Sequence, residues 1–174
     1  MAATIAMIDR EGYAAATTER IAKQAETSKG TLLYHFKSRE AIDEAVVRAL
    51  YDNGAAYMTT RITAVASSRD RLRAYLSSNL RFIAENTAHV NAVHRILDNT
   101  GAHIDIPDGV PGLRQLLTSG QLNGEFDSFD VEVMALSIRA VVDAASRHFA
   151  ANPNLDVDHY IDQASRIFDK ATTS

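Results

Sequence analysis

Two short helical segments with a very short turn between them constrain the fold of this chain more than any other feature of its sequence. The first segment, Thr17–Ala25, and the second, Ser28–Phe36, each begin at a residue that caps helices well. Glu26 and Thr27 form the turn between them. Two short helices joined in this way within about twenty residues have the geometry of a helix-turn-helix. The sequence therefore predicts this motif between Thr17 and Phe36.

The apolar residues of the two segments indicate which face of each helix points to the core. Ile21, Ala22 and Ala25 share one face of the first helix. Leu32 and Phe36 point inward from the second helix. The polar residues at the start of the second helix are then left for its outer face.

The start of the second segment has the chemistry that base recognition needs. Lys29 can donate hydrogen bonds to guanine acceptors or to a phosphate, and Thr31 offers its hydroxyl or its methyl group. Gly30 has no side chain, so the backbone can approach DNA closely. Helix N-termini and hydroxyl groups also bind phosphate well. The second helix is therefore expected to enter the major groove.

Helical periodicity continues along the rest of the chain, and runs of strand-favouring residues are absent. The sequence predicts an all-α fold with about nine helices. The further segments are residues 2–11, Ser38 to about Thr63, Leu72–Ile83, Thr87–Asp98, Leu113 to near Gly120, Asp130–Ala150 and Val157–Ala171. Asn99–Pro111, with two glycines and two prolines, is predicted to be a loop.

The composition excludes several classes of protein. The sequence has no cysteine, which excludes disulfides and thiolate metal sites. The most apolar stretch, Val131–Ala145, is interrupted by Arg139 and Asp143, so no membrane span is expected. The N-terminus does not have the pattern of a secretory signal. We expect a cytoplasmic protein.

The distribution of charge matters more than the net charge of −4. Thr17–Arg39 contains five basic and two acidic residues, a local net charge of +3. A small basic patch on an acidic chain is suited to specific docking on DNA rather than to indiscriminate coating of nucleic acid.

The sequence around the motif resembles the TetR family of transcriptional regulators. The matching runs are Gly12-Tyr13, Thr17–Ala25 and Ser28–Glu40, and the resemblance covers nearly all of residues 1–50. A weaker resemblance lies between Leu116 and Phe126, similar to the segment that often precedes the dimerising helices in this family. The resemblance implies a helix-turn-helix DNA-binding domain at residues 1–46. It implies a helical ligand-binding and dimerisation domain at residues 47–174.

The resemblance also implies two kinds of DNA contact. Bases would be contacted by Lys29, Gly30, Thr31 and Leu33, and phosphates by Thr18, Tyr34, His35 and Lys37. Leu33 has a second interpretation, as an exposed apolar residue without a DNA contact. Tyr34 and His35 could instead pack against neighbouring protein.

Three residues of the motif depart from the family pattern. Glu26 stands where glycine is usual and eases a positive φ, at a cost of about 1 kcal/mol. Thr27 replaces an apolar residue, and Leu33 stands where tyrosine is frequent. These departures leave the predicted fold unchanged and bear on which bases are preferred.

A single helix-turn-helix binds DNA weakly, so such motifs act in symmetric pairs on palindromic operators. The family resemblance implies that the last two helices form a homodimer interface. The residues expected there are Val141, Ala145, Phe149, Tyr160, Ala164, Ile167 and Phe168. The alternative interpretation of these residues is a core within one chain.

In this family a small-molecule effector binds among the helices between the DNA-binding domain and the dimer bundle. The candidate lining residues are Tyr57, Met58, Phe82, His89, His94, Leu97, Leu113, Leu116, Met134, Ile138 and Arg139. Most of them would also fit a plain core. Arg139 and Asp143 could pair internally, bind a polar ligand or pair across the dimer.

A metal site and an enzymatic function are not expected. His89 and His94 are five residues apart, which does not align them on one helix face, and neither they nor His103 cluster with carboxylates. The sequence shows no nucleophile with an acid–base partner, so neither catalytic residues nor a cofactor are predicted.

The leading hypothesis is a repressor that binds its operator as a dimer and is released by a small-molecule inducer. The alternative is an all-α dimeric interaction protein that kept the fold but lost specific DNA binding.

Overall fold

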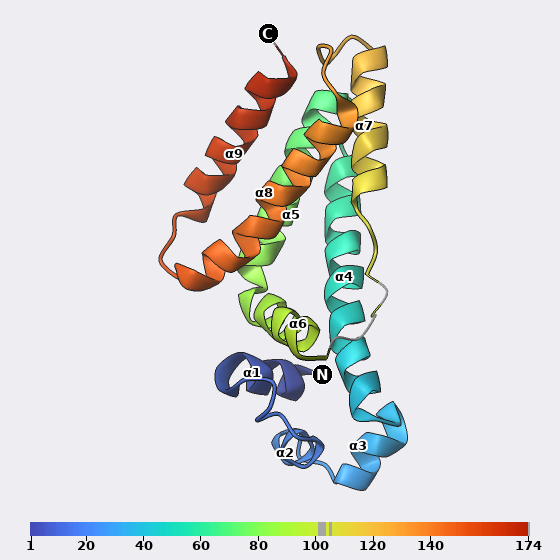
Figure 1. Cartoon of the computed structure of the whole chain (residues 1–174), viewed down its shortest axis with the longest axis vertical. Coiled ribbons are helices and arrows are strands. Elements are labelled where there is room, and N and C mark those ends of the chain that lie inside the picture. Colours follow the sequence, from blue (N-terminus) through green and yellow to red (C-terminus); the bar gives the residue numbers. More distant parts are fainter. Residues whose placement is uncertain (101–103, 105, 174) are drawn as a thin grey trace. The chain divides into compact units, whose positions relative to one another are not determined.

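The computed structural model describes residues 1–100, 104 and 106–173 of the 174-residue chain. Within these residues every regular element is an α-helix, and there are nine, which confirms the predicted fold class (Figure 1). They are α1 (Ala2–Glu11), α2 (Thr18–Gln24), α3 (Lys29–Phe36), α4 (Arg39–Thr63), α5 (Ser68–Glu85), α6 (Thr87–Thr100), α7 (Val110–Leu122), α8 (Val131–Ala151) and α9 (Val157–Thr172). None of the helices in this part of the chain has the length and apolar character needed to cross a membrane.

The predicted loop was too long at both of its ends. Helix α6 continues to Thr100, and α7 already begins at Val110, so Asn99 and Pro111 are helical. Pro111 lies in the first turn of α7, where its missing N–H would have had no helical partner. Helix α7 continues past Gly120 to Leu122, and the buried ring of Phe126 packs on that glycine.

The helices form two compact units. Unit 1 comprises Met1–Asn53 with Asn86–Ile106, and unit 2 comprises Gly54–Glu85 with Pro107–Ser174. Helix α6 therefore packs with α1 although it is far from it in sequence. The functional boundary expected after residue 46 is a different division from these packing units, and it stays a prediction.

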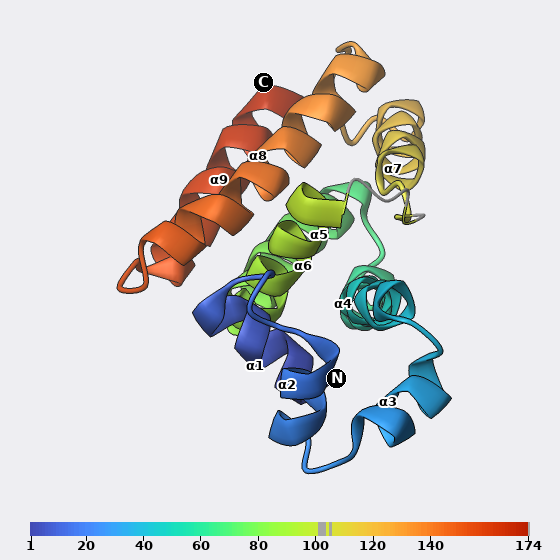
Figure 2. The same ribbon diagram turned by 60° about the horizontal axis from the view of Figure 1, so that its bottom comes forward.

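In unit 1, α1 and α6 lie side by side, as the views of Figures 1 and 2 agree. Apolar side chains from α1, α2, α4 and α6 form the core; its fully buried members include Ile8, Ile21, Ile42, Val46 and Ile96. Polar contacts add to it, since Arg95 of α6 donates to the backbone oxygen of Ile8 at 2.8 Å.

In unit 2, α5 packs against α7, α8 and α9. One apolar cluster contains Leu72, Leu76, Leu113, Leu117, Phe126, Ile138 and Phe168, and a second contains Leu80, Ala145, Phe149, Ile161 and Ala164. Part of the apolar stripes read from the sequence of the last two helices thus lies in the core of this unit.

Candidate DNA-binding interface

The two helices of the motif begin where the sequence predicts, each at a side-chain cap. Thr17 Oγ1 accepts a hydrogen bond from the Arg20 amide at 3.3 Å. Ser28 Oγ accepts one from the Thr31 amide at 3.0 Å. Each cap satisfies a backbone N–H that has no partner within its helix, so the polar sequence itself sets where α2 and α3 start.

The turn between the helices contains a residue in the left-handed region. Glu26 has a φ of 53°, which confirms the positive φ expected where glycine is usual. The Thr27 amide donates to the oxygen of Ala22 at 2.9 Å and closes the turn. Ala25 was placed wrongly on the inner face: α2 ends at Gln24, and Ala25 is exposed beyond that end.

The inner face of the motif is small. Ile21, Ala22 and Leu32 are buried, as expected. Phe36, predicted to be a core residue, is half-buried, and so is Leu33. Few residues therefore hold α3, and most of its surface is left open.

The outer face of the motif is exposed. Of the eight predicted DNA-contacting residues, six are exposed: Lys29, Gly30, Thr31, Tyr34, His35 and Lys37. Thr18 and Leu33 are half-buried. Tyr34 is 73% exposed, so its ring is available to a partner instead of packing in the core.

Two of the basic side chains of the motif form ion pairs with carboxylates of the same chain. Lys29 Nζ lies 2.6 Å from Glu19 Oε1, so the second helix is tied to the first. The hydrogen bond and charge of Lys29 lower the pKa of Glu19. Arg20 pairs with Glu11. A base or phosphate bound by Lys29 would therefore compete with Glu19 for its ammonium group.

Lys37 ends the recognition helix in an uncommon backbone conformation. Its φ is 67°, and its Nζ donates to the oxygen of Tyr34 at 2.8 Å while lying 4.8 Å from the centre of the Tyr34 ring. Tyr34 and His35 also meet edge to face. The three predicted phosphate contacts at the end of α3 thus form one exposed cluster. The sequence had no feature that predicts the φ of Lys37.

A buried polar cluster holds the start of α4, and the sequence analysis missed it. Asp43, only 1% exposed, accepts hydrogen bonds from the Tyr13 hydroxyl at 2.7 Å and from Arg39 Nε at 3.0 Å. Burial, together with the hydrogen bond to Asp43, raises the pKa of Tyr13. Because α4 follows directly on α3, this cluster fixes the end of the motif to the turn after α1. The spacing of Arg39 and Asp43, four residues apart, was the signal that could have revealed part of it.

The sequence profile of bacterial regulatory proteins of the tetR family matches residues 1–46. Through this segment the chain is similar to the tetR family. It is 37% identical over 78 residues to the HTH-type transcriptional regulator BetI 1 of Chromohalobacter salexigens, covering 44% of this chain and 39% of that protein. The chain spans about two fifths of the length of the curated relatives it matches.

Solved structures share the fold over nearly their whole length. A tetR-family regulatory protein of Rhodococcus RHA1 matches with a TM-score of 0.74 and 23% identity, covering 95% of this chain and 92% of that one. AibR, solved in complex with isovaleryl coenzyme A and operator DNA, matches with a TM-score of 0.75 and 19% identity over 94% and 92% of the two chains. At these identities the likeness shows the fold.

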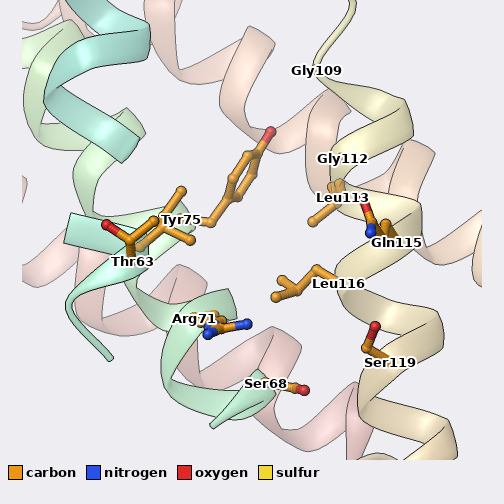
Figure 3. A pocket seen from close by; sticks show the side chains of 11 residues that line it. Thr63, Ser68, Arg71, Tyr75, Gly109, Gly112, Leu113, Gln115, Leu116 and Ser119 are labelled. Atoms are coloured by element: carbon orange, nitrogen blue, oxygen red, sulfur yellow. The ribbon is translucent and has the colours of Figure 1, made fainter. Parts of the chain in front are cut away.

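Unit 2 contains a cavity of about 450 Å³, lined by residues of α4, α5 and α7 and by Gly109 (Figure 3). Two residues of the predicted pocket, Leu113 and Leu116, line it. Arg71 and Tyr75, which the sequence analysis missed, line it too. They come from a helix whose sequence pattern showed only a core face, and α7 is brought to them by the fold.

The other predicted pocket residues lie elsewhere. In unit 2, the rings of Tyr57 and Phe82 pack at 5.6 Å, Met58 is half-buried, Met134 and Ile138 belong to the apolar core, and Arg139 pairs with Asp143 at 2.7 Å. In unit 1, α6 contains His89, His94 and Leu97. Among the described residues no cluster of histidines and carboxylates could hold a metal ion, and His103 lies outside them.

The predicted dimer residues divide into two groups. Ala145, Phe149, Ala164 and Phe168 are buried inside unit 2. Ile167 is 62% exposed, whereas Val141 and Tyr160 are half-buried. The first four therefore offer little surface to a partner, and the role of the other three stays a prediction.

Proposed function

We propose that this chain is a ligand-responsive repressor of the tetR family that binds a palindromic operator as a homodimer and is released by a small-molecule inducer. The observation that supports this most directly is the exposed polar face of α3, capped at Ser28 and presented on a helix-turn-helix. The cavity of unit 2 supplies a place for the inducer. The proposal assigns the DNA-binding role to residues 1–46, the ligand and dimer roles to residues 47–174, and no catalytic activity.

The relatives support the same function. BetI 1 is named as a transcriptional regulator, and AibR was solved with both a coenzyme A ester and operator DNA. A chain of this fold can therefore bind a ligand and an operator. A regulator of this kind acts where the bacterial DNA lies, in the cytoplasm.

For the DNA contacts, we assign bases to Lys29, Gly30, Thr31 and Leu33, and phosphates to Thr18, Tyr34, His35 and Lys37. Exposure supports six of the eight. Leu33 is half-buried and would contact a thymine methyl group only with the part of its side chain that remains open.

The dimer surface is assigned to the exposed faces of α8 and α9. Val133 and Leu136 of α8 and Ile167 of α9 are 61%, 51% and 62% exposed. Ala140 and Ala144 continue the α8 stripe at helical spacing and would let a partner helix approach closely. Val141 and Tyr160 border these faces, whereas Ala145, Phe149, Ala164 and Phe168 support them from the core.

Fluorescence anisotropy with the DNA upstream of the chain's own gene tests the proposal. We expect binding that is selective against a scrambled duplex of the same composition and that weakens steeply as salt rises. A dimer by light scattering that binds neither duplex at low salt would instead support the interaction-protein alternative.

A further inference from the structure

The cavity of unit 2 is amphipathic, with a single sign of charge. Its apolar wall includes Ile62, Leu113 and Leu116. Arg71 is the charged side chain among its described lining residues, and none of these residues is a carboxylate. Such a lining favours an apolar body and disfavours a cation, which would meet Arg71 without a counter-charge.

A backbone hydrogen bond orients the guanidinium of Arg71, and no carboxylate of the described residues pairs with it. Its Nε donates to the oxygen of Val65 at 3.1 Å, and its two terminal nitrogens have no partner in the part of the chain that the structure describes. In Figure 3 the side chain extends from α5 into the space before α7. Other arginines of unit 2 pair with carboxylates: Arg73 with Asp169, Arg114 with Glu132 and Arg139 with Asp143. The exposed side chain of Arg71 thus keeps both terminal NH₂ groups for an acceptor from outside the chain.

Tyr75 lies one turn further along the same face of α5. Its hydroxyl is buried, and the guanidinium of Arg139 lies beside it. A Cβ at Gly109 would lie 3.9 Å from this hydroxyl and 3.6 Å from Arg139 Nη1. A guanidinium carries hydrogen-bond donors and no acceptor. Figure 3 shows the Tyr75 hydroxyl toward Gly109 and Arg71 toward Ser68, so these two polar groups of the cavity lie apart.

We propose that this cavity binds an organic acid with an apolar body, whose carboxylate is held by Arg71. The apolar part of the acid packs against Ile62, Leu113 and Leu116. The guanidinium fork matches a carboxylate in geometry and charge. The inference rests on the proposed function, because it names the chemical class of the inducer.

Isothermal titration calorimetry with three probes of equal chain length tests the charge class. Sodium octanoate, octan-1-ol and octylamine differ only in their head groups. We expect octanoate to bind at least about tenfold more tightly than the other two. Equal or tighter binding of octylamine or octanol, or no binding of octanoate, would overturn the assignment.

Matched variants test the residues. Arg71→Gln should weaken octanoate binding about tenfold or more. Tyr75→Phe keeps the ring and removes a hydroxyl that lies apart from Arg71, so it should change octanoate binding far less. Arg69→Gln removes the same charge two residues away on the same helix, outside the cavity lining, and should bind octanoate like the unaltered chain. Circular dichroism of each variant checks the fold. Equal loss in Arg69→Gln and Arg71→Gln would show that only the overall charge matters, and would overturn the site.

The same protein samples, titrated with the upstream duplex, separate the two proposals. If DNA binds selectively but octanoate does not bind, the ligand class is wrong and the regulator proposal stands. If octanoate binds through Arg71 but no duplex binds, the cavity assignment stands and the regulator proposal fails. Release of the duplex by octanoate in the unaltered chain, and not in Arg71→Gln, supports both.

Discussion

The two compact units are held together by different kinds of contact. In unit 1, directional polar groups connect the elements: Tyr13 and Arg39 meet on Asp43, and Asn91 of α6 donates to Asp9 of α1 at 3.0 Å. In unit 2, the interior is an apolar cluster built on α5, α7 and α8, and its ion pairs, such as Arg73 with Asp169, lie toward the surface.

This difference matches the exposed helix α3 of unit 1 and the cavity of unit 2. Few apolar residues of the helix-turn-helix are buried, because most of α3 is exposed, as the proposed DNA contact requires. Hydrogen bonds of fixed geometry therefore set the orientation of its ends. Unit 2 can enclose its helices in close-packed apolar contact, and its cavity is a local opening in that packing. Removal of a buried polar group should therefore destabilise unit 1 most, and added side-chain volume in the core should destabilise unit 2 most.

The largest expected effect comes from Asp43→Ala. This substitution leaves Arg39 and Tyr13 without their buried acceptor, and breaking a buried pair of this kind costs about 3 to 5 kcal/mol. Glu44→Ala is the matched control, because Glu44 is the next residue and its pair with Arg48 is exposed, worth less than about 0.5 kcal/mol. Urea unfolding followed by circular dichroism measures both. A similar loss in the two variants would mean that the polar cluster does not hold unit 1.

Gly120→Ala tests the packing of unit 2. A Cβ there would lie 2.1 Å from Cδ2 of the buried Phe126 ring, so the ring must move, at a cost of about 2 to 3 kcal/mol. Gly112→Ala lies on the same helix with no atom within 4 Å of the new carbon, and should stabilise α7 by about 0.5 to 1 kcal/mol. Urea unfolding should show a lower free energy of unfolding for Gly120→Ala and a higher one for Gly112→Ala. Two neutral variants would show that unit 2 tolerates added volume.

The same difference explains what the sequence alone could reveal. Thr17, Ser28 and Glu26 act within a few residues of their own positions, so the caps, the turn and the exposed face of α3 were readable in advance. Asp43 meets Tyr13 from thirty residues away, and only its spacing from Arg39 is local. Arg71 and Leu116 line one cavity because the fold brings α5 and α7 together, which periodicity cannot indicate. The prediction for α8 and α9 had the right apolar stripes, but four of those side chains pack inside unit 2.

Lys29→Ala and Lys37→Ala sharpen the comparison at the exposed surface of unit 1. Lys29 is assigned to bases, so its loss should weaken operator binding about tenfold and relax the preference at particular bases. Lys37 is assigned to phosphate, so its loss should weaken all sequences about equally and reduce the salt slope by about 1. Anisotropy on a set of single-base operator variants measures both profiles.

Lys170→Ala is the charge-matched control for these two variants. Lys170 is exposed on α9 in unit 2, so its loss should leave the base preference unchanged. Identical profiles for Lys29→Ala and Lys37→Ala would show that the division between base and phosphate contacts is wrong. An unchanged affinity in Lys29→Ala alone would mean that the Glu19 pair keeps Lys29 from DNA.

The smallest effect concerns the pH dependence of unit 1. His89 Nε2 donates to the backbone oxygen of Val46 at 2.8 Å, and burial of the ring lowers the pKa of His89, although this hydrogen bond opposes the shift. Above the unfolded-state pKa of about 6.5, the ring is neutral in both states and stability is complete. As the pH falls below that value, the unfolded chain binds a proton more readily than the folded chain, so stability is lost.

Thermal unfolding between pH 7.5 and pH 6 should therefore show a decline of less than about 1 kcal/mol that is reduced in His89→Gln. His159→Gln, an exposed position on α9 of unit 2, should keep the full decline. If the decline is lost in His159→Gln and kept in His89→Gln, the acid-sensitive contact belongs to unit 2, and the polar contacts of unit 1 are not where protonation acts. If only His89→Gln removes the fall in stability between pH 7.5 and pH 6, a buried polar group of unit 1 accounts for the acid sensitivity of the protein. Buried polar groups would then explain both this acid sensitivity and the expected loss of stability in Asp43→Ala.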